Sequence, residues 1–197
     1  LKDDILIPRS IFHETQEYII ISICSNAFRC SKIKNVQFDG DSQIRIIESE
    51  AFVSSSIQSI TISPHLTEIC DGAFKFCKKL NKIEIPENSE LKKIGQNAFS
   101  FSQIKSLLIP KSVIELSDGW CNNTNYLNQI TLIQNNQRYS MIDDKLIIGK
   151  SKIDKKNFDV LVFAVRNIKK VTIPRYIEII SQSAFEECNN IEEFKIE

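Results

Sequence analysis

Apolar residues recur along the chain at fixed distances from an Ala-Phe dipeptide that returns about every 22 to 25 residues. An apolar residue stands four positions and again seven positions before each alanine. The copies of the dipeptide are Ala27-Phe28, Ala51-Phe52, Ala73-Phe74, Ala98-Phe99 and Ala184-Phe185. A repeat of this length predicts a solenoid, in which each copy forms one coil and covers the apolar residues of its neighbours.

A second pattern, apolar-x-x-apolar-x-apolar, follows each dipeptide. Its last three positions alternate, as in a short strand with one buried face. The pattern occupies residues 33–38, 57–62, 80–85, 104–109, 127–132, 168–173 and 191–196. Proline often closes it, as at Pro86, Pro110 and Pro174, because proline cannot continue a strand ladder. We therefore expect seven strands in one parallel sheet roughly 30 Å long.

The Ala-Phe half of each copy is expected to return the chain to the next strand. Alanine permits close approach of neighbouring coils, and phenylalanine fills the space between them. The repeat length lies within the leucine-rich-repeat range of roughly 20–29 residues. The fold expected for residues 1–197 is a single curved α/β leucine-rich-repeat solenoid, with a short parallel sheet on one face and a β-hairpin insert.

Residues 134–165 break the period and carry three further apolar runs. Tyr139–Ile142 and Leu146–Ile148 flank Asp143-Asp144, a pair that suits a turn, and Val160–Ala164 follows. These runs predict a hairpin-type insert built into the solenoid.

Two other places depart from the repeat. Trp120-Cys121 stands where Ala-Phe is expected, so this copy is degenerate. Near the start, Ile5, Ile7 and Pro8 have the pattern of a strand end, and Arg9–Glu17 is then predicted to be a long connection. The chain starts without Met and ends directly after a repeat strand, which suggests a fragment of a longer repeat array.

The pattern I-x-x-x-A-F-x-x-C, followed by L-x-x-I-x-I-P, resembles the BspA-like leucine-rich repeats of microbial surface antigens. The clearest copies are Ile69–Pro86 and Ile180–Ile196, and the insert resembles a hairpin element that recurs in that family. The resemblance implies a curved solenoid with a strand-lined face. It also implies a role in adhesion to host cells, matrix proteins or other microbes, and a cell-surface or extracellular location. The absence of a secretion signal departs from the family's pattern.

Charge gives no general attraction to nucleic acid or to an anionic membrane, because Lys+Arg and Asp+Glu are both 25. The densest basic run, Lys150 to Lys156, is interrupted by Asp154 and is expected to be a solvated loop spanning Lys150–Asn157. No uncharged apolar stretch reaches the roughly 20 residues that a membrane span needs, so no direct membrane insertion is expected.

Candidate chemistry is sparse, so we expect no enzyme, no cofactor and no metal site. His13-Glu14-Thr15-Gln16-Glu17 resembles half of a zinc-protease helix but lacks the second histidine, and His65 has no partner at motif spacing. The six cysteines occupy repeat-defined positions in no C-x-x-C pair, which favours buried thiols over a structural disulfide. Asn122-Asn123-Thr124 is a single glycosylation sequon.

The remaining hypothesis is a protein-binding face on the outward side of the strands. Mostly small or polar residues occupy these positions, with Leu108 as an apolar exception near the middle, and an apolar anchor within a polar rim suits an interface. The candidate face comprises Thr61, Lys82, Glu84, Ser106, Leu108, Gln129, Thr131, Lys170 and Thr172. The opposite side of the solenoid and the hairpin remain alternative sites of binding.

The sequence therefore predicts a non-enzymatic protein-binding module, with an adhesion function and a host or matrix protein as the partner. The alternative is an intracellular, cytoplasmic scaffold or cytoskeleton-associated protein that uses the same solenoid, since free thiols suit a reducing compartment.

Overall fold

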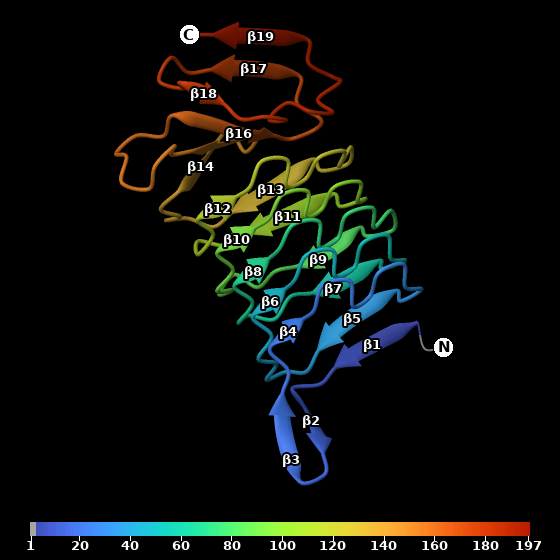
Figure 1. Cartoon of the computed structure of the whole chain (residues 1–197). Helices are drawn as coiled ribbons and strands as arrows, with labels where there is room; N and C mark the ends of the chain where they lie inside the picture. The colour runs from blue at the N-terminus through green and yellow to red at the C-terminus, as the bar shows by residue number, and fades with distance from the viewer. Residues whose placement is uncertain (1–2) are drawn as a thin grey trace.

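The computed structural model describes residues 3–197, which form an elongated stack of coils (Figure 1). One side of the stack carries parallel strands, and all seven predicted strands are present there, preceded by one more. These first-face strands are β1 (Asp4–Ile7), β5 (Asn35–Phe38), β7 (Ser59–Thr61), β9 (Lys82–Glu84), β11 (Ser106–Ile109), β13 (Gln129–Leu132), β17 (Lys170–Ile173) and β19 (Glu193–Ile196). They are hydrogen-bonded in three groups, β1-β5-β7-β9, β11-β13 and β17-β19. The prediction of one continuous sheet was therefore wrong.

A second parallel sheet, which was not predicted, lines another side of the stack. Its strands are β12 (Glu115–Leu116), β10 (Lys93–Ile94), β8 (Glu68–Ile69), β6 (Ile46–Ile47) and β4 (Ser22–Ile23), in that order. Each strand has only two residues, and the second buries its side chain in the core, as Ile47 and Ile69 do. Two residues are too few to produce a recognisable alternation in the sequence.

The α/β class was wrong, because residues 3–197 contain no helix. The Ala-Phe arm is instead a run of tight turns. The residue before the alanine and the residue three after it have positive φ, between 55° and 66°, in each coil that carries the arm; Asn26 and Cys30 are the first such pair. A left-handed residue on each side of so short an arm prevents a continuous right-handed helix. The turns of successive coils are joined by backbone hydrogen bonds, such as Phe52 N–H to the Ala73 carbonyl at 2.8 Å.

Stacked phenylalanines fill the core beneath these turns, as the sequence predicted. The ring centroids of Phe28 and Phe52 lie 4.9 Å apart, those of Phe52 and Phe74 5.0 Å, and those of Phe74 and Phe99 5.6 Å. Trp120 does occupy the alanine position, since its carbonyl accepts the Phe99 N–H at 2.9 Å. The large ring thus stands at the alanine position in the degenerate copy, and the smaller Cys121 stands at the phenylalanine position.

The predicted insert is present. β14 (Tyr139–Ile142) and β15 (Leu146–Gly149) form an antiparallel hairpin, and β16 (Val160–Ala164) pairs with β15 in the antiparallel sense. Val160 and Leu161 of β16 also pair in parallel with β18 (Ile179–Ile180), which continues the second side of the solenoid. Lys150–Asn157 is a largely exposed loop, as expected.

The N-terminal connection is not a simple loop, which corrects the prediction for Arg9–Glu17. β2 (Ser10–His13) and β3 (Gln16–Ile19) form a second antiparallel hairpin between β1 and β4. It projects from the end of the stack (Figure 1). Glu14 takes a left-handed φ of 55° at the tip, a backbone conformation that the sequence reading did not anticipate for this residue.

Candidate functional site

The candidate face lies on the first-face strands, with its polar side chains directed outward. Eight of its nine residues are exposed: Thr61, Lys82, Glu84, Ser106, Gln129, Thr131, Lys170 and Thr172. Leu108 is half-buried and packs against the hydrophobic core. It therefore presents part of an apolar side chain at the surface while its own position is fixed by packing.

The middle of the face is formed by β11 and β13. Their parallel register places Ser106 beside Gln129 and Leu108 beside Thr131. Neither strand contributes a charge at these four positions, so this part of the face is neutral and weakly apolar. Burial of such a patch by a partner carries little cost for removing charge from water.

Charges border this neutral patch on one side, where β9 contacts β11. On the N-terminal side, Glu84 accepts a hydrogen bond from the Thr61 hydroxyl at 2.8 Å and pairs with Lys82 at 2.5 Å. The Lys82 ammonium and then the Thr61 hydroxyl hold the pKa of the Glu84 carboxyl below its usual value. The Glu84 carboxylate therefore stays ionised at neutral pH, and together with Lys82 it forms a charged rim.

The C-terminal side of the face is separated from the middle by the insert. Lys170 pairs with Glu193 at 3.1 Å, and Lys195 pairs with the same carboxylate at 2.5 Å. Hydrogen bonds from Lys195 and Lys170 lower the pKa of Glu193. β17 has no ladder to β13, so Lys170 and Thr172 lie in a third sheet, apart from the β7 and β9 residues and from the β11 and β13 residues of the face.

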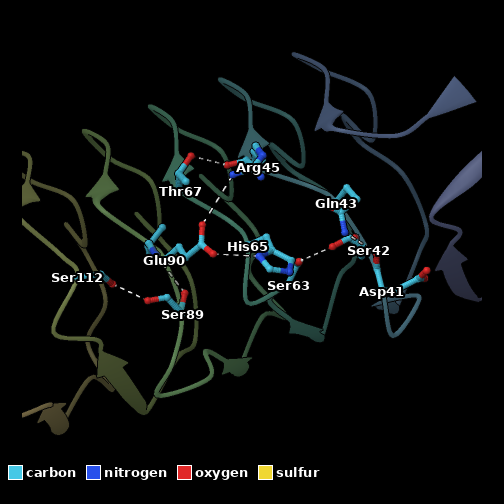
Figure 2. A network of polar contacts seen from close by, with 11 residues as sticks. Asp41, Ser42, Gln43, Arg45, Ser63, His65, Thr67, Ser89, Glu90 and Ser112 are labelled. Carbon is cyan, nitrogen blue, oxygen red and sulfur yellow. Dashed lines mark hydrogen bonds and ion pairs between the residues drawn. The ribbon is translucent and has the colours of Figure 1, made fainter.

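A polar ridge that the sequence reading missed follows the corner between the two sheets (Figure 2). The Glu90 carboxylate is hydrogen-bonded to the His65 ring nitrogen Nδ1 at 3.0 Å. Its other oxygen forms an ion pair with the Arg45 guanidinium at 3.7 Å. Beneath them, the Ser63 hydroxyl donates to the Ser42 carbonyl at 3.3 Å. His65 thus has an acidic partner 25 positions further along the chain. Only the coil geometry brings such distant residues together.

Three cysteines confirm the prediction of buried thiols, namely Cys77, Cys121 and Cys188. Burial raises the pKa of Cys77 to about 11 and that of Cys121 to about 12, so both thiols stay protonated and unreactive at neutral pH. Cys24 and Cys30 are exposed, which corrects the prediction for these two. Cys30 lies at a left-handed turn position, φ 55°, where its side chain points to solvent instead of the core.

The candidate zinc-protease fragment lies on the exposed β2–β3 hairpin. His13 pairs with Gln16 across the strands, and every residue of both strands except Ser10 is exposed. Within residues 3–197, no three His, Cys, Asp or Glu side chains are grouped closely enough to hold a metal ion. The same part of the chain contains no helix that could cross a membrane.

The sequence of the coils matches the model of one known repeat family. The BspA-type leucine-rich-repeat region matches residues 21–142 and 152–197, with six copies. The chain belongs to the BspA-type leucine-rich-repeat family. The match covers both sheets, the turn arms and part of the insert.

Solved structures of bacterial leucine-rich-repeat proteins have a similar fold. The pneumococcal vaccine antigen PcpA matches with a TM-score of 0.80 at 22% identity, over 98% of this chain and 54% of that protein. A leucine-rich cell surface protein from Faecalibacterium prausnitzii gives 0.59 at 17% identity, over 98% and 69%. A leucine-rich-repeat protein from Bacteroides ovatus gives 0.64 at 20% identity, over 97% and 45%.

This chain therefore spans about half the length of PcpA and of the Bacteroides protein. No curated protein sequence is similar enough to count as a match.

Proposed function

We propose that this BspA-type domain is a non-enzymatic, cell-surface module that binds a protein partner, such as a host or matrix protein, in adhesion. The observation that carries the proposal is the neutral patch formed by Ser106, Leu108, Gln129 and Thr131, which is bordered by the charged Lys82 and Glu84 of β9. A half-buried apolar residue with polar neighbours and a charged border has the arrangement of an interface core and its rim.

Two of the similar structures support the cell-surface part of the proposal. One is described as a vaccine antigen and the other as a cell surface protein. Fold alone does not determine function, so the binding role rests on the face and on family membership together.

The test uses the paired substitution Leu108→Lys and Thr131→Lys. Two ammonium groups at the centre of the patch have to be desolvated on binding, which opposes association without disturbing the exposed side of the fold. A matched control, Ile114→Lys with Gln96→Lys, adds the same charge at exposed positions outside the first-face strands. Binding is measured by attachment of purified domain to immobilised matrix proteins and to cultured host cells.

The expected result is loss of attachment for the Leu108/Thr131 variant, which stays folded but melts below the control variant because Leu108 loses part of its packing against the core. Equal attachment by both variants and the unmodified domain would remove the candidate face from consideration. Attachment lost equally in both variants would point to a general effect of added charge.

A second function, an intracellular scaffold, is favoured by one specific observation. All six cysteines are free, and Cys24 and Cys30 are exposed to solvent. Exposed free thiols persist most readily in a reducing compartment. The scaffold would use the same face, and localisation of the protein separates the two functions.

A further inference from the structure

The side of the solenoid that joins the Ala-Phe turns to the first-face strands carries no acidic residue over five coils, and three of these coils add basic residues to it. The segments 28–35, 52–59, 74–82, 99–106 and 121–129 hold eight Lys or Arg residues and no Asp or Glu. The chain as a whole has zero net charge, so this side is polarised. The equivalent segment of the last coil, 185–193, has the opposite character, with four glutamates and no basic residue.

Three of these eight basic residues, Arg29, Lys34 and Lys82, are paired with a carboxylate. Arg29 pairs with Glu50 at 2.8 Å, Lys34 with Asp3 at 2.6 Å, and Lys82 with Glu84 at 2.5 Å. Lys78, Lys79 and Lys105 differ, because none of these three ammonium groups has a carboxylate oxygen within 4.0 Å in residues 3–197. Three uncompensated cations therefore lie close together on adjacent coils.

These three lysines line an open groove of about 590 Å³ at the edge where the arrows of β7 to β13 begin (Figure 1). Gln58, Asn81 and Gln103 supply amide groups to the same groove. The floor is fixed by hydrogen bonds between coils: the Asn81 N–H donates to the Gln58 carbonyl at 3.0 Å and the Gln103 N–H to the Leu80 carbonyl at 2.8 Å. The site is preformed by the solenoid and needs no rearrangement to take a ligand.

Aromatic side chains complete the groove. Tyr126 lies on its wall and is 50% exposed. Beside it, the exposed Phe76 and Phe101 rings stack at 4.6 Å, and Phe101 and Tyr126 line an adjoining hollow of about 270 Å³ with Lys78. Flat exposed rings next to amides and ammonium groups match the three parts of an acidic sugar: its C–H face, its hydroxyl groups and its anionic substituents.

We propose that this groove binds a linear anionic polysaccharide that carries sulfate or carboxylate groups. Lys78 and Lys79 of one coil and Lys105 of the next contact successive anionic groups along the chain, as flexible point charges. The amides hydrogen-bond hydroxyl groups, and Tyr126 stacks on a pyranose ring. An acidic protein segment would use the lysines and could pair its backbone with the amides, but it offers no repeated flat C–H face to stack on the Tyr126 ring.

The experiment measures binding of a heparin-derived hexasaccharide to the purified domain by calorimetry, at low and at physiological ionic strength. The test variant is Lys78→Gln, Lys79→Gln, Lys105→Gln. The control variant, Lys145→Gln, Lys152→Gln, Lys156→Gln, removes the same charge from exposed positions in and near the insert. A third variant, Tyr126→Ala, removes only the exposed ring.

The groove variant is expected to bind roughly 10- to 100-fold more weakly at low salt, with a shallower dependence on salt, because it forms fewer ionic contacts. The control is expected to change by less than about threefold, since distant charges are screened. Tyr126→Ala is expected to weaken binding while the salt dependence stays the same. All variants change exposed side chains, so melting temperatures should agree.

Three outcomes would overturn the proposal. In the first, the hexasaccharide fails to bind the unmodified domain at low salt. In the second, the groove variant and the control variant lose the same amount of binding affinity, which indicates an effect of net charge alone. In the third, a poly-glutamate peptide of equal charge binds as tightly as the hexasaccharide, which assigns the groove to acidic protein segments instead. Because the groove and ring variants leave Ser106, Leu108, Gln129 and Thr131 unchanged, failure here does not test the proposed protein-binding face.

Discussion

The β2–β3 hairpin lies between β1 and β4, and the β14–β15 hairpin lies between β13 and β16. Both follow a first-face strand, but they differ in burial. All four residues of β15, Leu146–Gly149, are buried. Every residue of β2 and β3 except Ser10 is exposed, including Phe12 at 71%. The position in the repeat therefore allows a hairpin but does not decide whether it joins the core.

Strand pairing explains much of the difference. β15 is hydrogen-bonded on both sides, to β14 and to β16, and its continuous apolar sequence suits a strand covered on both faces. β2 and β3 pair only with each other. An isolated two-stranded hairpin is marginally stable in water, so the N-terminal hairpin depends on its attachment to the solenoid.

Polar anchors explain the rest. The Tyr139 hydroxyl accepts the Leu116 N–H at 2.8 Å, which ties β14 to the edge of the preceding coil. Buried Asp159 accepts bonds from the Ser151 N–H at 2.7 Å and hydroxyl at 2.6 Å and pairs with Lys155 at 2.5 Å. The N-terminal hairpin has exposed ion pairs from Arg9 to Glu17 and Asp41, both at 3.3 Å, and a backbone bond from the Ile20 N–H to the Arg9 carbonyl at 2.9 Å.

The largest expected difference is between matched isoleucine substitutions in the two hairpins. Ile147→Ala removes a side chain that is 0% exposed, and we expect it to lower the free energy of unfolding by roughly 2–5 kcal/mol. Ile11→Ala, at a side chain 53% exposed, is expected to cost less than about 0.5 kcal/mol. Urea denaturation followed by circular dichroism measures both. Equal costs would contradict the assignment of one hairpin to the core and the other to the surface.

Asp159→Asn tests the buried anchor and its pH dependence. Burial alone raises the pKa of Asp159, but Lys155 and Ser151 bring it to about 2, below the ordinary 3.8. This carboxylate therefore stabilises the fold fully above its ordinary pKa, and the contribution is lost as pH falls through about 2.

We expect the Asn variant to lose roughly 2–4 kcal/mol at neutral pH. Its stability should also fall less steeply than that of the unmodified domain between pH 4 and the folded pKa of about 2. Thermal melts at a series of pH values measure this, with Asp154→Asn in the exposed loop as control. Parallel pH profiles for the two variants would show that Asp159 is not an anchor.

Tyr139→Phe removes one hydroxyl and leaves the buried Leu116 N–H without its acceptor. The expected cost is roughly 1–2 kcal/mol, with faster hydrogen exchange at the Leu116 amide. Exchange mass spectrometry should localise the change to β12 and β14. Tyr18→Phe on the exposed hairpin is the control, and protection at Leu116 that is the same in both variants would contradict the role of the Tyr139 hydroxyl.

Arg9→Ala is expected to change the stability of the domain least among these substitutions. Its two ion pairs are solvent-exposed, so we expect the melting temperature to stay within about 1 °C of the unmodified domain. Differential scanning calorimetry is sufficient. A drop of several degrees would mean that the projecting hairpin contributes to the stability of the first coils.

The two hairpins also show what the sequence can and cannot predict. The insert was recognised because two apolar runs flank a clear Asp-Asp turn and a third apolar run follows them. β2 and β3 were missed because Glu14-Thr15 is not a typical hairpin turn and the strands bury almost nothing. The first-face strands were predictable from their alternation, whereas the two-residue strands of the second sheet, such as β6, carry no period.

The candidate site was predictable only in part. Outward exposure of Thr61 or Thr131 follows from strand alternation, but the separation of Lys170 from Gln129 depends on how the insert interrupts the sheet. The basic groove was missed because its lysines are distributed over two coils, while the contiguous run from Lys150 to Lys156 drew attention. Positive φ, which excludes a helix, falls on Asn or Gly before the arm in four coils, as at Asn26 and Gly72, and this signal in the sequence was missed. At the position after the arm, as at Cys30, positive φ is a property of the coil and not of the residue type.

The most direct test of the central claim, a binding module at the cell surface, is protease shaving of intact cells that express the full-length protein, followed by peptide mass spectrometry. The account predicts release of peptides from residues 1–197, starting with cleavage in the exposed β2–β3 hairpin and the Lys150–Asn157 loop. Complete protection of these segments in intact cells, with release only after lysis, would contradict it and favour the intracellular scaffold.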